Sequence, residues 1–417
     1  MSSLNARLFS NSFYLALIQA ANLGLPLLTF PYLVRILGIE LFGVLALATA
    51  VMHYANVLID YGFNLTAARQ VAQDRNNREA LSALFSRVQL IKLCLTMICV
   101  TSLGGVQLFT SWLGDYTLLY WVVLAGVVAT ALFPVWLFQG MERMRTVSIL
   151  NVATKAVFTV GIFVLVQAPE DYLFSPLLFL LGAIFTLLLG CYLAFKQFDL
   201  IWVWPSMPAL ISQLRESWYV FLSQLKVTLF SNTNVVILGA FAGPVSVGYY
   251  AGAEKLMRAL AQLQTPVTQA LFPQISQLMV DQPSLAFQRL RKVMLVGVLV
   301  YLALLVVVFA LADWFCVLLF AEDGVMIATL LRWMLPIPLC IFLNNIFGTQ
   351  ILLNQGRDRV FFWVLMIVAI FRLVICSILA DQYQHYGAAV ALLMTEVVLV
   401  SVFAWLVKAD VLKKSYV

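Results

Sequence analysis

The chain has 417 residues, of which 63% are apolar and only 11% are charged. Soluble domains carry roughly 25% charged residues, so this composition excludes a water-soluble globular protein. The formal net charge of +6 comes with only two histidines, which disfavours a histidine-based catalytic mechanism.

Long apolar runs follow one another along the whole sequence. Runs of about 20 such residues match the hydrocarbon thickness of a bilayer. The pattern predicts an all-α integral membrane protein with about twelve transmembrane helices. The first run is too long for a signal peptide, so we expect it to stay as a span. The spans are expected at residues 12–35, 41–62, 87–109, 117–139, 146–168, 172–195, 217–241, 246–277, 292–312, 325–354, 360–380 and 386–407.

Charges between these spans alternate in sign, which predicts the orientation of the chain. Positive residues mark the cytoplasmic side of a membrane. Both termini are therefore expected in the cytoplasm. The basic loops carry Arg69, Arg75, Arg78, Arg87, Arg143, Arg145, Lys196, Arg215, Arg289, Arg291, Lys292, Arg357, Arg359, Lys408, Lys413 and Lys414. The opposite loops carry Glu40, Asp115, Glu170, Asp171, Asp313, Glu322, Asp323 and Asp381.

Most tryptophans fall near predicted span ends, where an aromatic belt is expected. Trp136 lies at a predicted inner end, whereas Trp333 lies inside a predicted span. His385 falls in a predicted outer loop and is expected to be a solvated surface residue, while His53 lies within the second span.

Twelve spans divide into two halves of six. We predict an N-terminal lobe at 1–196, a cytoplasmic interfacial linker at 197–216 and a C-terminal lobe at 217–417. Two parallel six-helix bundles with the substrate between them are a known transporter plan.

Two short traces of an internal repeat support this division. A glycine-rich outer turn follows the first helix of each half, at Gly38 and at Gly243. The fourth helix of each half ends in a Gln-Gly pair, within 138–140 and 354–356. Chance similarity between short glycine turns is the alternative explanation.

Basic residues within the predicted spans are the strongest functional signal. Each would cost roughly 2.5–3.5 kcal/mol on insertion scales unless it faced water or a partner. Lys92 is close enough to the inner interface to snorkel towards it. The deeper bases, with Arg35 at a span end, predict a cationic cavity for an anionic substrate. They are Arg35, Lys155, Lys226, Lys255, Arg258, Arg332 and Arg372.

Fewer acids lie within the spans, so a fully neutralised ion-pair network does not account for every base. Asp60, Glu254 and Glu396 are candidates for ion coupling. Glu254 and Arg258 stand four residues apart, so they are expected to pair on one helix face. Polar uncharged residues fit either a cavity lining or hydrogen bonds between helices. These residues are Gln19, Asn22, Asn232, Asn234, Asn344 and Asn345.

Several sequence blocks resemble the polysaccharide-transport flippases, the O-antigen or O-unit translocases of the multidrug/oligosaccharidyl-lipid/polysaccharide exporter superfamily. The first block is Leu-Pro-Leu-Leu-Thr-Phe-Pro-Tyr-Leu-Val-Arg at 25–35, and the second is Tyr-Gly-Phe-Asn-Leu-Thr-Ala at 61–67. Further similar blocks lie at 134–140, 266–270 and 386–389. The resemblance covers essentially the whole chain and does not single out one sugar.

This resemblance implies two six-helix lobes around a central cavity. It implies an undecaprenyl-diphosphate-linked oligosaccharide as substrate, moved from the cytoplasmic to the periplasmic leaflet of a bacterial inner membrane by alternating access. Membrane lipid, a polymerase and a chain-length regulator of the same pathway are the expected partners. A diphosphate also suits the cationic interior inferred from the residues themselves.

Two other functions compete with this one. A drug or cation antiporter of the same superfamily would call for an acidic cavity, whereas bases exceed acids in these spans. A membrane polymerase or glycosyltransferase usually needs a sizeable loop with paired carboxylates, and the predicted outer loops are short. We expect no enzymatic activity, no cofactor, no metal and no nucleic-acid partner, because no motif for phosphate, metal or nucleophilic chemistry is found.

Overall fold

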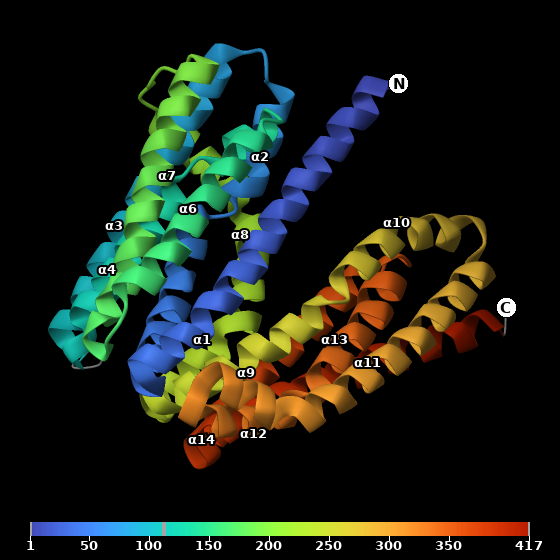
Figure 1. Ribbon diagram of the computed structural model, residues 1–417. Helices are drawn as coiled ribbons and strands as arrows, with labels where there is room; N and C mark the ends of the chain where they lie inside the picture. Colours follow the sequence, from blue (N-terminus) through green and yellow to red (C-terminus); the bar gives the residue numbers. More distant parts are fainter. Residues whose placement is uncertain (1, 111–113, 416–417) are drawn as a thin grey trace. The chain divides into compact units, whose positions relative to one another are not determined.

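The computed structural model describes residues 2–110 and 114–415, without the side chains of residues 2–23, 25–27, 146, 230 and 410–415. Regular structure in this part of the chain is helical throughout (Figure 1). Seven of its helical stretches are long and apolar enough to cross a membrane. One of them, Pro283–Leu353, has 71 residues and contains two of the predicted spans. The prediction of an all-α membrane protein is confirmed, while the number of twelve spans stays a prediction.

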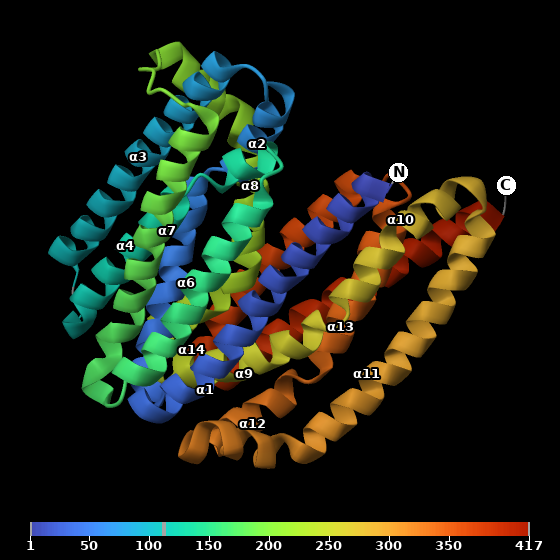
Figure 2. The same ribbon diagram turned by 45° about the horizontal axis from the view of Figure 1, so that its top comes forward.

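The chain divides into two compact units, Met1–Asn232 and Thr233–Val417, which we call the N-terminal and C-terminal units. In the N-terminal unit, α1, α4, α6 and α7 pack side by side, and α3 contacts α1 and α4 (Figures 1 and 2). The short α2 packs on α5. The bounds are α1 Ser2–Asp60, α2 Phe63–Gln73, α3 Arg78–Phe109, α4 Thr117–Leu132, α5 Val135–Gly140, α6 Met144–Leu165 and α7 Phe174–Phe198, with 3-10 turns at Gly114–Tyr116 and Pro169–Leu173.

The C-terminal unit is built in the same manner from α9 to α14. Helix α12 packs between α9, α11 and α14, and α13 contacts α9 and α14. Helix α8, Met207–Phe241, passes from one unit into the other. The bounds are α9 Gly243–Gln262, α10 Thr265–Asp281, α11 Pro283–Phe320, α12 Gly324–Met334, α13 Pro336–Asn344 and α14 Asp358–Ser415, with the 3-10 turn η3 at Ala321–Asp323 and the π-helix η4 at Asn345–Leu353.

The two predicted glycine turns have the same backbone conformation. Gly38 interrupts α1 with φ 77 and ψ 166, and Gly243 begins α9 with φ 76. Residues with a side chain rarely adopt such positive φ values, so glycine is needed at both places. Both predicted glycine turns are thus present, while the internal repeat stays a prediction.

The second trace of the repeat, at the ends of the two fourth helices, is shifted by two residues from its predicted register. The fourth helices end at left-handed residues, Glu142 with φ 56 and Gly356 with φ 71. In each case the next amide donates back to a carbonyl five residues earlier, Arg143 to Phe138 and Arg357 to Leu352. Glu142, not Gly140, is thus the counterpart of Gly356. Gly140 serves close packing instead, because a Cβ there would lie 2.5 Å from the Cβ of Val71.

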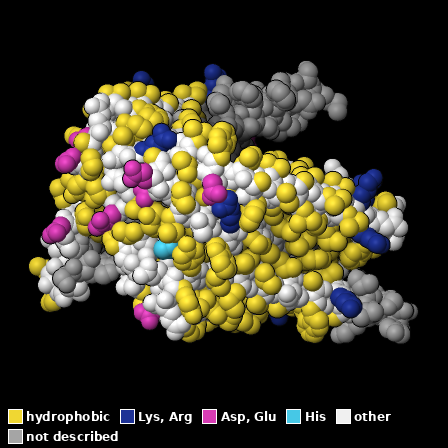
Figure 3. Space-filling view, turned by 60° about the horizontal axis from the view of Figure 1, so that its bottom comes forward, with side chains coloured by type: hydrophobic (Ala, Val, Ile, Leu, Met, Phe, Trp, Pro, Cys, Tyr) yellow, Lys and Arg dark blue, Asp and Glu magenta, His cyan; other side chains and the backbone are white. Residues whose placement is uncertain are grey.

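The surface outside the core is strongly apolar, as a lipid environment requires (Figure 3). The core of the N-terminal unit gathers the aromatic side chains Phe63, Phe85, Phe138 and Trp136. Trp136 is 0% exposed. Its predicted place in an interfacial belt is therefore wrong, because α5 turns this ring inwards.

The predicted linker at 197–216 is partly helical. Residues 200–206 lie against α3, where Ile201 and Val203 donate their backbone N–H groups to Ser82 and Ser86 at 3.1 and 3.0 Å. From Met207 onward the chain is already in α8. The boundary between the two compact units, after Asn232, falls inside this helix. The predicted lobe boundaries stay a prediction.

Candidate functional site

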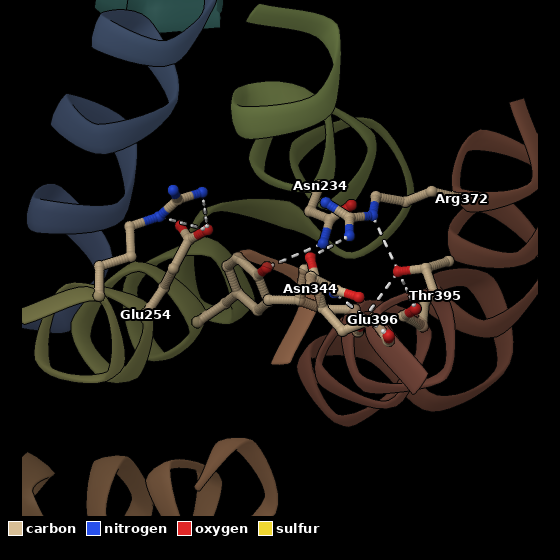
Figure 4. Close-up of polar contacts among 10 residues, drawn as sticks. Asn234, Glu254, Asn344, Arg372, Thr395 and Glu396 are labelled. Atoms are coloured by element: carbon tan, nitrogen blue, oxygen red, sulfur yellow. Dashed lines mark hydrogen bonds and ion pairs between the residues drawn. The ribbon is translucent and has the colours of Figure 1, made fainter. Parts of the chain in front are cut away.

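A buried polar network in the C-terminal unit connects two predicted residues of opposite charge. The kink at Gln384 folds α14 into two helices, which brings residues 24 positions apart into contact. Arg372 donates to the Glu396 carboxylate at 2.8 Å and to the Thr395 hydroxyl at 2.9 Å. Asn344 of α13 donates to the other carboxylate oxygen of Glu396 at 2.8 Å (Figure 4). Both charged side chains are buried, so each needs the other to offset its desolvation.

A second acid–base pair lies on α9. Arg258 donates through two nitrogens to one carboxylate oxygen of Glu254, at 2.8 and 3.1 Å (Figure 4). The pairing predicted from their spacing is confirmed. The Arg258 side chain is 41% exposed and that of Glu254 is 10% exposed, so the cation extends outwards from a buried acid. Lys255, the next residue after the acid, is exposed.

Amide side chains complete this network. Asn234 of α8 donates to the Tyr250 hydroxyl at 2.9 Å. The side-chain carbonyl oxygens of Asn234 and Asn344 are buried and accept no hydrogen bond from any described residue. Unsatisfied buried acceptors are uncommon and often mark functional positions. The predicted polar residues Asn234 and Asn344 thus lie with the charged pairs.

The N-terminal unit has its own buried ion pair. Lys92 of α3 donates to Asp60 at 3.2 Å and to the carbonyl oxygen of Ala131 at 2.7 Å. The Lys92 side chain is 1% exposed, which excludes snorkelling to the interface, one of the two explanations that the sequence left open for this lysine. The sequence carried a signal for this ion pair, because Asp60 lies near the end of one predicted span and Lys92 near the start of the next.

The role of Lys92 follows from the break between α4 and α5. Pro134 has no N–H group, and the backbone leaves the helix at Phe133. The Val135 amide then bonds to Phe133 rather than to Ala131. Lys92 supplies the missing donor to Ala131, and Gln89 does the same for Leu132 at 2.9 Å.

A pocket of about 400 Å³ with a mainly apolar lining and several polar side chains lies within the N-terminal unit. The predicted cavity residue Lys155 lines it and is half-buried. Sequence reasoning did not find the hydroxyl side chains beside this lysine, since single threonines in apolar helices give no pattern. The polar lining includes Thr130, Asn151, Thr154, Lys155, Thr159 and Thr186.

The remaining predicted residues are dispersed. Arg35 is exposed on α1, three residues before the break at Gly38. Lys226 is half-buried on α8. Arg332 makes a two-pronged pair with Asp313 at 2.9 and 2.7 Å, in which the acid is 56% exposed. Asn232 is half-buried, while Asn345 accepts a long bond of 3.4 Å from Gln350. The side chains of Gln19 and Asn22 lie outside the described residues.

Comparison with solved structures identifies the fold. The chain superimposes on the "Lipid II flippase MurJ, inward closed conformation" with a TM-score of 0.76 over 94% of this chain and 87% of that one, at 12% identity. It also matches an inward-facing multidrug resistance MATE family transporter of the MOP superfamily, with a TM-score of 0.70 over 94% and 99% of the two chains, at 16% identity. At these identities the likeness concerns the fold alone.

Sequence comparison identifies the family. The chain is 29% identical to the "Putative O-antigen transporter" of Escherichia coli (strain K12), over 95% of this chain and 96% of that protein. The family model described as polysaccharide biosynthesis protein matches residues 8–279. The resemblance seen in the sequence blocks is thereby confirmed: the chain belongs to the polysaccharide biosynthesis protein family, and its fold is the one seen in the MurJ and MATE structures.

Proposed function

We propose that this protein is a flippase that moves an undecaprenyl-diphosphate-linked oligosaccharide from the cytoplasmic to the periplasmic leaflet of a bacterial inner membrane. The observation that carries the proposal is the similarity over 95% of the chain to a relative named as an O-antigen transporter. A saccharide repeat unit of a surface polysaccharide is the proposed cargo, moved by alternating access. Because the relative is named as a transporter, we propose no catalytic activity.

The charges within the helices support an anionic substrate. Asp60, Glu254 and Glu396 each pair with one base. The bases within the predicted spans outnumber these three acids, and this positive balance suits a diphosphate. We therefore propose Arg258 and Lys255, with Arg35, Lys155 and Lys226, as the headgroup contacts, and Arg332 and Arg372 as secondary ones held by Asp313 and Glu396.

Ion coupling through an acid is a further part of the proposal. Glu254 is the strongest candidate, because its partner Arg258 is partly exposed and one helical turn away. Protonation of Glu254 would release Arg258 to a phosphate, whereas Asp60 and Glu396 are held in fully buried pairs. Charge-neutral Glu254→Gln is expected to weaken the pH dependence of transport in reconstituted vesicles. An unchanged pH profile removes Glu254 from this role.

Deletion of the gene tests the function as a whole. We expect lipid-linked oligosaccharide to accumulate on the cytoplasmic face, together with loss of surface polysaccharide. Loss of the polysaccharide without this accumulation contradicts the flippase proposal and points to an earlier or later step. A polymerase and a chain-length regulator are the proposed partners, and their loss would shorten chains rather than trap the repeat unit.

Substitution of Lys255 tests the cationic contacts in the same deletion strain. Lys255→Ala is expected to reduce export about tenfold, as for the loss of one charge-assisted phosphate contact of about 1.5 kcal/mol. Lys255→Arg keeps the charge and should retain most export. The matched control is Lys408→Ala, because Lys408 is also exposed but lies near the C-terminal end of α14. Export by Lys255→Ala equal to that by the control contradicts the role of this lysine.

A further inference from the structure

An aromatic pocket in the C-terminal unit is not used by the charged network. It has a volume of about 800 Å³, within the usual range for ligand pockets. Thr329 and Trp333 of α12 stand one turn apart on its wall. The kinked part of α14 supplies Gln382, Tyr383, Gln384 and Tyr386.

The kink of α14 shapes this pocket. Gln384 has φ 50 and ψ −132, an unusual conformation for a residue with a side chain. The Tyr386 ring meets the Trp333 ring edge to face, with centroids 6.4 Å apart. The Trp333 and Tyr383 side chains are 53% and 60% exposed, so two aromatic surfaces are open to a ligand.

A buried imidazole lies beside the lining residues. His385 is 8% exposed and packs against the rings of Tyr249 and Tyr386 at 5.6 and 4.6 Å. The expectation that it is a solvated loop residue is therefore wrong. Neither of its ring nitrogens has a hydrogen-bond partner among the described residues. The Tyr249 hydroxyl donates to the Asp323 carboxylate at 3.1 Å, and this bond holds the Tyr249 ring against the imidazole.

The position of Trp333 argues against a simple membrane anchor. Belt tryptophans lie at helix ends, at the level of the lipid headgroups. Trp333 is the last but one residue of α12, but α13 and η4 follow directly and continue the same apolar helical stretch to Leu353, so the ring lies inside this stretch and not at its end. Its exposed ring also faces a second aromatic side chain and two glutamine amides rather than lipid alone.

The chemistry of the lining selects among ligands. None of the residues that line the pocket is charged, so an anionic headgroup has no cation to meet there. An acyl chain would leave the amides of Gln382 and Gln384 without partners, which costs free energy. A pyranose ring has an apolar C–H face for the aromatic rings and hydroxyl groups at its rim for the amides and Thr329.

We infer that the aromatic pocket is a binding subsite for a neutral pyranose unit of the transported saccharide. The inference rests on the proposed function for the identity of the cargo. The pocket would recognise sugar, whereas the bases would recognise phosphate, so the two parts of one substrate would be bound by different chemistry.

Saturation-transfer NMR on the full chain in lipid nanodiscs tests this inference. Maltotriose and N,N′,N″-triacetylchitotriose serve as probes, because both are soluble, neutral and made of pyranose rings. We expect saturation of sugar ring protons with the unsubstituted protein and at least a tenfold weaker apparent affinity for Trp333→Ala. Trp333→Phe should restore part of the affinity. The matched control is Trp405→Ala, since Trp405 is 67% exposed on α14 but does not line the pocket.

The outcomes separate this inference from the proposed function. Equal binding by Trp333→Ala and the control, or no transfer to either sugar, overturns the pocket assignment. Saturation transfer to glycerophosphoglycerol but to neither sugar assigns the pocket to a lipid headgroup and also overturns it. Each of these results leaves the gene-deletion test untouched. Conversely, sugar binding at Trp333 without accumulation of lipid-linked oligosaccharide in the deletion strain contradicts the flippase function alone.

Discussion

The side chain of Lys92 shows how one charge is accommodated inside an apolar helix bundle. It neutralises Asp60 and also bonds the Ala131 carbonyl that the break at Pro134 leaves without its helical donor. The lysine is therefore held by both charge and backbone. Its burial could not be predicted from α3 alone, because the need for it arises in α4, 39 residues further along.

Removal of this charge should destabilise the N-terminal unit. Lys92→Met leaves the Asp60 carboxylate buried without a partner, a change that costs about 3–5 kcal/mol in buried pairs. We expect a clear fall in the melting temperature of the detergent-purified protein, measured by tryptophan fluorescence. The double substitution Asp60→Asn with Lys92→Met should recover the part of the loss that comes from the unpaired carboxylate, but not the part that comes from the Ala131 carbonyl. If Lys92→Met has the same melting temperature as the unsubstituted protein, the pair has no structural role.

At the scale of elements, the turns and breaks were predicted better than the contacts between helices. Gly38 and Gly243 were recognised because a glycine requirement is local to the backbone. The network of Arg372, Glu396 and Asn344 joins residues 24 and 52 positions apart on different helical segments, and spacing along one helix carries no information about it. The register of the fourth-helix ends was missed for a related reason, since Glu142 adopts the left-handed conformation that the sequence would assign to a glycine.

Replacement of Gly38 tests the backbone requirement directly. A Cβ at this position would meet nothing within 4 Å, so any effect of Gly38→Ala comes from its φ of 77 rather than from a clash. We expect a loss of about 1–3 kcal/mol, seen as a lower melting temperature. Gly105→Ala is the control, because Gly105 also has open space around it but lies within α3. There alanine should be neutral or stabilising by up to about 1 kcal/mol. Equal effects of the two substitutions would contradict the argument.

At the scale of the whole molecule, composition and the runs of apolar residues were sufficient for the fold class. The units, the helix breaks and the apolar surface all agree with a membrane-spanning helical protein. The placement of the candidate site was less predictable, because individual bases within apolar helices can pair, snorkel or line a pocket. Lys92 and Arg258 pair with acids, whereas Lys155 lines a pocket, and only the pairing of Arg258 was evident from spacing along one helix.

The orientation of the chain is a prediction at this scale. The alternation of basic and acidic loops places both termini in the cytoplasm. A fluorescent protein that matures only in the cytoplasm, fused after Val417, should therefore be bright, while alkaline phosphatase fused there should be inactive. Phosphatase fused after Asp381 should be active instead, since that acid lies in a predicted outer loop. An active phosphatase at the C-terminus would invert the predicted topology.

The two buried ion pairs described above have a consequence for how the chain enters the membrane. Asp60 and Lys92 are 32 residues apart, and Arg372 and Glu396 are 24 apart, so each pair joins two consecutive predicted spans. A nascent helix that carried one of these charges by itself would pay roughly 2.5–3.5 kcal/mol to leave the translocation channel. A hairpin of both helices leaves it as a neutral unit. Each pair therefore favours insertion of its two helices together, in the order in which the ribosome makes them.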